Sequence, residues 1–227
     1  MARAGKMVPM QMSDGAVIEV YHVQPTGTRR GGLVLIQEIF GVTDHIKELC
    51  DGYGADGYEV LGPALYDREA PGLQASYDTP EDLQKAVKVA RELHPFPLSI
   101  ADTQTCIDAL KAAGPVFITG YCYGGSVSWV AACRCDGLAA ASGYYGSLIP
   151  QFAGETPKCP TILHFGERDH GIPLDGVRKV QEAHPEVPVY IYDAGHGFNS
   201  DRRADYHPES AQLARERTLA LFRANGG

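Results

Sequence analysis

The chain has 227 residues, a length that suits one sizeable domain over 1–227 rather than two. Apolar residues make up 44% and charged residues 21%, ordinary globular values that exclude a disordered or fibrous chain. The net charge of −8 argues against nucleic acid and anionic membranes as partners. No apolar run approaches the roughly 20 residues of a membrane span, and no apolar core follows the basic start. We therefore expect a cytoplasmic protein.

Strands and helices alternate along the chain. The first two strands, 7–12 and 16–23, flank an Asp-Gly turn and predict a β-hairpin. The apolar run 33–36 is typical of a strand buried on both faces of a parallel sheet. The pattern predicts an α/β fold with a mostly parallel central sheet flanked by helices. The further predicted elements are, in order, a helix over 46–53, a strand over 58–61, a loop over 64–79, helices from Pro80 and over 100–110, a strand over 115–119, a helix over 126–132, strands over 138–142 and 161–165, a helix over 175–184, a strand over 187–192 and a helix over 209–224.

The helix that begins at Pro80 has a clear start signal, because Thr79 is a good N-cap and proline is favoured at the first position. Its apolar residues recur at helical spacing and predict one buried stripe. That stripe comprises Leu83, Ala86, Val87 and Ala90.

A candidate nucleophile lies in Gly120-Tyr121-Cys122-Tyr123-Gly124, between an apolar strand and a helix of small residues. The segment fits the G-x-nucleophile-x-G turn, with cysteine in place of serine. Glycines on both sides let strand and helix approach closely around the strained nucleophile. The turn would place Cys122 at a helix N-terminus, where backbone N–H groups favour a thiolate and an oxyanion.

Two candidate partners follow in chain order. Asp169 comes just after strand 161–165, and His196 just after strand 187–192. Nucleophile, acid and histidine, each past the carboxyl end of a strand, are in the order of the α/β-hydrolase triad. Each residue alone is also compatible with an ordinary loop position, so the order and shared edge carry the interpretation.

Metal and dinucleotide sites have no support in the sequence. The histidines and the six cysteines lack ligand spacing for zinc, and no G-x-G-x-x-G follows a strand. We therefore expect no metal and no cofactor, and interpret most cysteines as small buried side chains.

The chain resembles the dienelactone hydrolase (carboxymethylenebutenolidase) family, the cysteine-triad branch of the α/β-hydrolase fold, over nearly its whole length. The segments that carry the resemblance are Gln37-Glu38-Ile39-Phe40-Gly41, Gly120-Tyr121-Cys122-Tyr123-Gly124-Gly125, Gly143-Tyr144-Tyr145-Gly146, Gly166-Glu167-Arg168-Asp169 and Gly195-His196-Gly197-Phe198.

The resemblance implies roles that spacing alone does not give. Glu38 would contact the resting thiol and, once substrate displaces it, help to deprotonate Cys122. The oxyanion hole would be the backbone N–H groups of Ile39 and Tyr123. The implied substrate-binding residues are Phe40, Tyr144, Phe198 and Arg202.

The resemblance implies a carboxylic ester hydrolase that acts in the degradation of aromatic compounds. We expect the protein to be a monomer. It would open a cyclic enol lactone, of the dienelactone-to-maleylacetate type, through a Cys-His-Asp triad and an acyl-enzyme. The family's substrate-carboxylate arginines have no clear match here. Arg202 is the nearest candidate past the histidine, and Arg203 is interpreted as surface charge. The alternatives are a carboxylesterase of broader specificity on small activated esters and a non-catalytic binding protein of the same fold.

Overall fold

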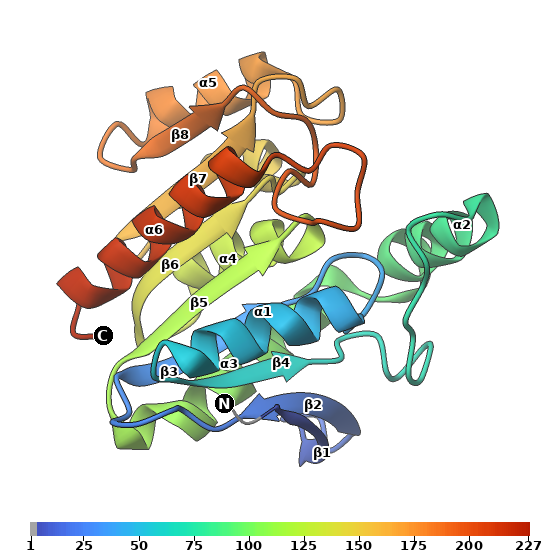
Figure 1. Cartoon of the computed structure of the whole chain (residues 1–227), viewed down its shortest axis with the longest axis vertical. Coiled ribbons are helices and arrows are strands. Elements are labelled where there is room, and N and C mark those ends of the chain that lie inside the picture. Colours follow the sequence, from blue (N-terminus) through green and yellow to red (C-terminus); the bar gives the residue numbers. More distant parts are fainter. Residues whose placement is uncertain (1–3) are drawn as a thin grey trace.

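The computed structural model describes residues 4–227, whose eight strands form one sheet in the order β1-β2-β4-β3-β5-β6-β7-β8 (Figure 1). The strands β1 and β2 form the predicted antiparallel hairpin, β2 pairs antiparallel with β4, and the remaining pairs are parallel. The strands are β1 (Lys6–Gln11), β2 (Val17–Val23), β3 (Gly31–Ile36), β4 (Tyr58–Pro63), β5 (Val116–Tyr121), β6 (Leu138–Tyr144), β7 (Thr161–Gly166) and β8 (Val189–Tyr192).

Helices cover both faces of the sheet, with α1 and α6 in front in Figure 1 and α3 and α4 behind. The helices are α1 (Asp44–Ala55), α2 (Pro80–Lys88), the π-helix η1 (Val89–Leu93), α3 (Phe96–Leu110), the 3-10 turn η2 (Lys111–Ala113), α4 (Tyr123–Arg134), the 3-10 turn η3 (Ile149–Phe152), α5 (Leu174–Ala183) and α6 (Pro208–Ala224). Within residues 4–227, none of these helices combines the length and apolarity needed to span a membrane.

The core has one layer on each face of the sheet, because successive strand residues point to opposite sides. In β3, Leu33 and Leu35 pack with residues of α1 and α6, whereas Val34 and Ile36 pack with residues of α3 and α4. This confirms the prediction that the apolar run 33–36 is buried on both faces.

Strand order reverses at β3, which lies between β4 and β5. Ligands of open parallel sheets bind outside the carboxyl ends of the strands at such a switch point. Glu38 follows the carboxyl end of β3, and Cys122 follows that of β5. The topology therefore brings these two residues to the same edge.

The helix α2 projects from the body of the molecule (Figure 1). Ala86 is buried in a small cluster with Phe40 and Ala75, apart from the two main layers of the core. Leu83 is 45% exposed, so the prediction that it belongs to a buried stripe is wrong. Helical spacing identifies one side of a helix, but here that side overhangs a cavity instead of resting on the sheet.

Candidate active site

Cys122 lies on a sharp turn between β5 and α4. Its φ of 56° and ψ of −112° are a strained backbone conformation for a residue with a side chain. The Cys122 N–H donates to the Tyr144 carbonyl oxygen at 3.0 Å, which ties the turn to the neighbouring strand β6. Helix α4 begins at Tyr123 rather than at Ser126, so the sulfur is directly at a helix N-terminus.

The glycines around Cys122 are required by close backbone approach. A Cβ at Gly120 would overlap the carbonyl oxygen of Gly124, and one at Gly124 would overlap that of Ile36. A Cβ at Gly125 would overlap the Tyr144 carbonyl oxygen. The turn thus holds β3, β5, β6 and α4 at backbone contact around the sulfur.

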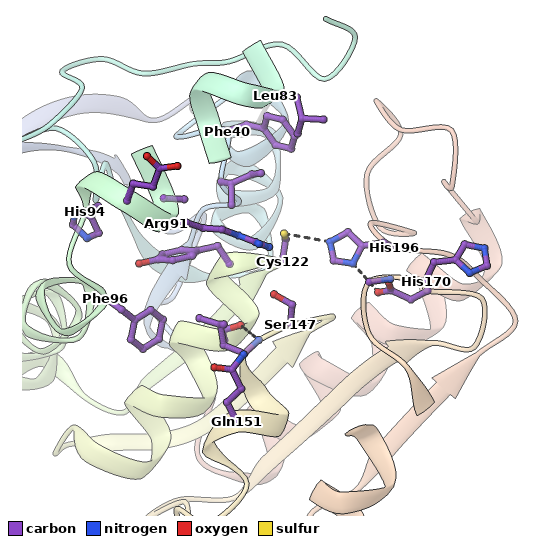
Figure 2. Close-up of a pocket in the computed structure, with 18 of the residues that line it drawn as sticks. Phe40, Leu83, Arg91, His94, Phe96, Cys122, Ser147, Gln151, His170 and His196 are labelled. Atoms are coloured by element: carbon purple, nitrogen blue, oxygen red, sulfur yellow. Dashed lines mark hydrogen bonds and ion pairs between the residues drawn. The ribbon is translucent and has the colours of Figure 1, made fainter. Parts of the chain in front are cut away.

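Cys122, His196 and Asp169 form a hydrogen-bonded chain (Figure 2). The His196 Nε2 lies 3.2 Å from the Cys122 sulfur, and Nδ1 lies 2.6 Å from Asp169 Oδ2. Asp169 is buried, and its Oδ1 accepts a hydrogen bond from the Gly171 N–H at 2.8 Å. Both carboxylate oxygens are therefore occupied, and the carboxylate orients the imidazole towards the sulfur.

The pKa of His196 reflects two opposing effects. Burial lowers the pKa, but hydrogen bonds to Asp169 and Cys122 outweigh it and raise the pKa to about 10. The two hydrogen bonds therefore make the imidazole a stronger proton acceptor than an isolated histidine.

Glu38 is fully buried after β3, and its Oε2 accepts a 2.6 Å hydrogen bond from the Tyr77 hydroxyl. Oε1 has no hydrogen-bond partner among residues 4–227, and no hydrogen bond joins Glu38 to Cys122 there. Burial, followed by the Glu38 charge, raises the pKa of Tyr77, so the phenol keeps the proton that it donates. In this arrangement Glu38 pairs with Tyr77, while the thiol pairs with His196.

The backbone N–H groups of Ile39 and Tyr123 have no protein acceptor in the described part of the chain. Tyr123 is the first residue of α4, where N–H groups are unpaired by the geometry of a helix start. Both residues line the same cavity as Cys122, so both N–H groups belong to residues at the edge of that space.

The cavity has a volume of about 1010 Å³ and opens over Cys122. Leu83, Leu93 and Phe96 contribute apolar surface, and Arg91 and Arg203 contribute charge. Neither of these two guanidinium groups forms a hydrogen bond or ion pair with residues 4–227. In the view of Figure 2, Arg91 points towards the side of the cavity where Cys122 lies.

The structure separates the four implied substrate-binding residues. Phe40 lines the cavity, whereas Tyr144 and Phe198 are fully buried and do not. The Tyr144 hydroxyl is 2.7 Å from Thr218 Oγ1, away from the cavity. Arg202 also lies outside the cavity lining.

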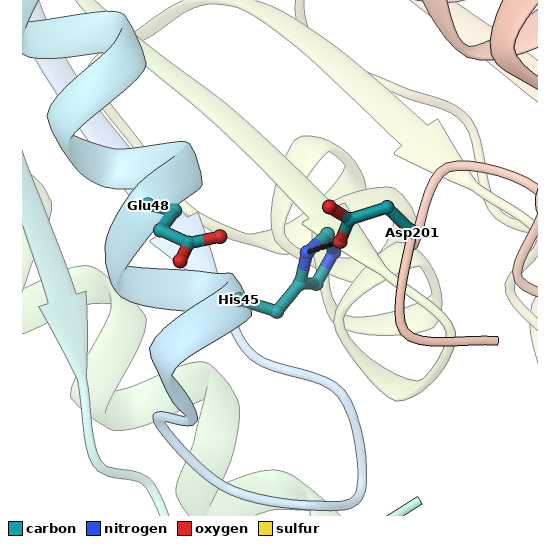
Figure 3. Close-up of side chains that lie close together, drawn as sticks. All are labelled: His45, Glu48 and Asp201. Atoms are coloured by element: carbon teal, nitrogen blue, oxygen red, sulfur yellow. Dashed lines mark ion pairs between the residues drawn. The ribbon is translucent and has the colours of Figure 1, made fainter.

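Arg202 forms ion pairs with Glu48 and Asp201 at the surface. Figure 3 shows these two acidic side chains beside His45. The Arg202 guanidinium lies 2.8 Å from a carboxylate oxygen of each acid. The arginine thus supplies the positive charge that these two carboxylates attract.

The sequence identified Arg91 as one end of the segment searched for a substrate-binding arginine but gave it no role, and Arg203 was interpreted as surface charge. Arg203 instead lies at the cavity, with its guanidinium carbon 5.9 Å from the centre of the Phe40 ring. Arg91 is in the π-helix η1, where the wider helical turn changes which residues face inwards. Neither placement has a signal in residue spacing.

Comparison with known proteins places this geometry in a family. The sequence profile described as "Dienelactone hydrolase family" matches residues 18–226. A protein of Escherichia coli (strain K12) named "Putative carboxymethylenebutenolidase" is 30% identical over 95% of this chain and 85% of its own length. The crystal structure titled "Putative Dienelactone Hydrolase" from Klebsiella pneumoniae has a TM-score of 0.83 and 28% identity, covering 97% of this chain and 99% of its own.

More distant structures share the fold. An esterase of Pyrococcus furiosus has a TM-score of 0.71 at 13% identity, covering 98% of this chain and 92% of its own. The sheet order and these likenesses confirm the predicted α/β-hydrolase fold. The chain belongs to the dienelactone hydrolase family and has the fold of its hydrolases.

Proposed function

We propose that the protein opens cyclic enol lactones of the dienelactone type, with Cys122 as nucleophile and His196 and Asp169 as its partners. One observation carries the proposal: a sulfur on a strained turn, hydrogen-bonded at 3.2 Å to an imidazole that a buried carboxylate orients, faces a large cavity. Nucleophile, base and orienting group within hydrogen-bond reach support acyl transfer.

In the first half-reaction the Cys122 sulfur attacks the lactone carbonyl while its proton passes to His196 Nε2. The new C–S bond forms as the carbonyl electron pair moves onto oxygen. The N–H groups of Ile39 and Tyr123 hold this oxyanion. On collapse the ring C–O bond breaks, and the leaving enolate takes the proton from His196. An acyl-enzyme with an open ring results.

In the second half-reaction a water molecule attacks the thioester carbonyl while His196 takes its proton. Collapse of the second oxyanion breaks the C–S bond, and the sulfur regains the proton. The product is an open-chain acid whose enol becomes a ketone. A thiolate suits this chemistry because the enolate is a good leaving group.

Glu38 is proposed to help deprotonate Cys122 when substrate enters. Its burial, its unpartnered Oε1 and the influence of both Glu38 and Cys122 on Tyr145 support a carboxylate close to the thiol. After burial, the charges of these two groups raise the pKa of Tyr145 furthest. A nearby carboxylate disfavours a resting thiolate, so reactivity would depend on bound substrate.

The substrate is proposed to be an anion. Arg91 and Arg203 are at the cavity with their guanidinium groups free of acidic partners in residues 4–227. Guanidinium groups match carboxylates in geometry and charge, and they are the strongest such donors in proteins. These two residues, rather than Arg202, are proposed to bind the substrate carboxylate.

Turnover of a dienelactone and of p-nitrophenyl acetate, by wild type and by Cys122→Ala, tests the proposal. We expect a strong preference for the lactone and no activity of the variant on either substrate. Cys159→Ala is the matched control, because Cys159 is partly exposed and does not line the cavity. Activity retained in Cys122→Ala would contradict the proposed mechanism.

A broader carboxylesterase is the second candidate, favoured by the size of the cavity. About 1010 Å³ is at the upper end of small-molecule pockets, and apolar side chains line part of it. In the same assay, turnover of the simple ester without turnover of the lactone would favour this candidate.

A further inference from the structure

A second chain of hydrogen bonds lies beside the proposed triad and ends on the residue next to the nucleophile. Glu69 Oε2 is 2.9 Å from His94 Nδ1, and His94 Nε2 is 2.9 Å from Ser99 Oγ. Ser99 Oγ is 2.8 Å from the Tyr123 hydroxyl. The four residues come from the turn after β4, the end of η1, the first turn of α3 and the first turn of α4.

The chemistry of the end groups fixes the direction of donation. A carboxylate only accepts, so Glu69 assigns the proton to His94 Nδ1 and leaves Nε2 as an acceptor. The Ser99 hydroxyl then donates to Nε2, and the Tyr123 hydroxyl donates to Ser99. Every polar atom between the carboxylate and the phenol is satisfied, which makes such a buried network rigid.

These residues do not form a second nucleophilic site. Ser99 has the partners of a triad serine but is fully buried, so no substrate can reach its hydroxyl. Aromatic rings pack closely around this hydrogen-bond network. The ring centre of Tyr66 lies 5.1 Å from that of His94 and 5.5 Å from that of Tyr123. The network can therefore influence the proposed reaction only through the residues that it holds in place, and Tyr123 is the one next to Cys122.

Tyr123 links the network to the reacting atoms. Its backbone N–H is next to Cys122, lacks a protein acceptor in residues 4–227 and is half of the proposed oxyanion hole. We propose that Glu69, His94 and Ser99 are positioning residues that hold Tyr123, and with it this N–H, in the orientation that binds the oxyanion.

The same network fixes the wall that carries Arg91. The backbone N–H of His94, three residues after Arg91, donates to the Val89 carbonyl oxygen at 2.9 Å and ends η1. The network thus holds both the Tyr123 N–H, a proposed oxyanion donor, and η1, the helix that carries Arg91. This inference rests on the proposed cysteine mechanism, and its test separates the two.

The test compares two reactions of the same sulfur in full-length Tyr123→Phe, Ser99→Ala and the double variant. Acylation is followed as the burst of nitrophenolate from p-nitrophenyl acetate, which passes through an oxyanion. Alkylation by iodoacetamide is a displacement at saturated carbon and forms no oxyanion. Thr103→Val is the matched control, because Thr103 is a buried hydroxyl on α3 that donates only to the Ser99 carbonyl oxygen.

We expect the acylation rate to fall about tenfold in each single variant, since loss of an oxyanion donor costs at least about a hundredfold and here the donor is displaced, not removed. KM should change little, the alkylation rate should stay within about twofold, and the double variant should lose about as much as either single one. Thr103→Val should keep its acylation rate.

Three results would overturn the inference: no loss of acylation, an equal loss of both reactions, or an equal loss in Thr103→Val. If Ser99→Ala fails to fold, Tyr123→Phe decides by the same criteria, because it keeps the ring and the backbone N–H. Failure of the cysteine mechanism itself has a different signature, namely a burst that persists in Cys122→Ala.

Discussion

The most direct consequence of the site geometry concerns Asp169→Asn. An asparagine keeps the shape of the side chain and can keep Oδ1 as acceptor for the Gly171 N–H, which lies at 2.8 Å. Its amide NH₂ group then faces His196 Nδ1, where the carboxylate oxygen now lies at 2.6 Å. Because an NH₂ group only donates there, Nδ1 must accept, and the ring proton moves to Nε2.

A proton on Nε2 faces the Cys122 sulfur, so the imidazole can no longer receive the thiol proton. The loss of a correctly oriented base in a triad lowers kcat by about 10³ to 10⁴, or roughly 4 to 5.5 kcal/mol of activation free energy. The measurement is kcat on p-nitrophenyl acetate, with Asp136→Asn as a control at an exposed ion pair with Lys158. A variant within tenfold of wild type would refute this reasoning.

The same variant has a predicted pH signature. The native pKa of His196 is raised to about 10, whereas a histidine in the unfolded chain titrates near ~6.5. The stabilisation is therefore complete below pH ~6.5 and is lost as the pH rises towards about 10. Urea unfolding at pH 6.5, 8 and 9.5 should show a smaller decline in Asp169→Asn than in wild type. Equal slopes would contradict the role of Asp169 in the raised pKa.

Three further changes have expected outcomes. Gly124→Ala should destabilise the protein by about 2–4 kcal/mol in urea unfolding, because its Cβ overlaps backbone that cannot move, whereas Gly154→Ala, with open space around it, should not. Tyr77→Phe removes the one hydrogen bond that the buried Glu38 carboxylate accepts within residues 4–227, so the free energy of unfolding should fall by about 1–3 kcal/mol; an unchanged midpoint would contradict this. Leu83→Ser should raise KM for p-nitrophenyl esters with long acyl chains and leave turnover of the acetate unchanged; equal effects on both esters would exclude a substrate contact.

The fold and the proposed triad could be predicted because their signals are local. Each triad candidate follows a strand whose apolar run is visible in the sequence, and parallel strands bring their carboxyl ends to one edge. Glycine spacing around Cys122 likewise reflects backbone contacts within one turn. The Glu38 position depended on a family resemblance, since no spacing rule links a loop after β3 to a thiol after β5.

The walls of the cavity could not be predicted, because they depend on how long loops pack. A π-helix has no distinctive composition, so the sequence could not predict that the Arg91 side chain faces the cavity. The contact between His94 and Glu69 joins residues 25 positions apart through one hydrogen bond. Arg202 and Arg203 are consecutive residues of the same type, so the sequence does not distinguish them. Arg202 pairs with Glu48 at the surface, whereas Arg203 lines the cavity.

The small cluster beneath α2 bears on how the enzyme can change over evolutionary time. Phe40, Ala75 and Ala86 form their own apolar contact, whereas Cys122 and the strand ends belong to the layers of the sheet. Because stability is distributed unevenly, the outer wall can open or accept substitutions without unfolding the sheet. Selection can thus vary the shape of the entrance while the reacting groups stay fixed. The separation of these two clusters lets substitutions at the cavity wall change substrate choice without altering the packing around Cys122.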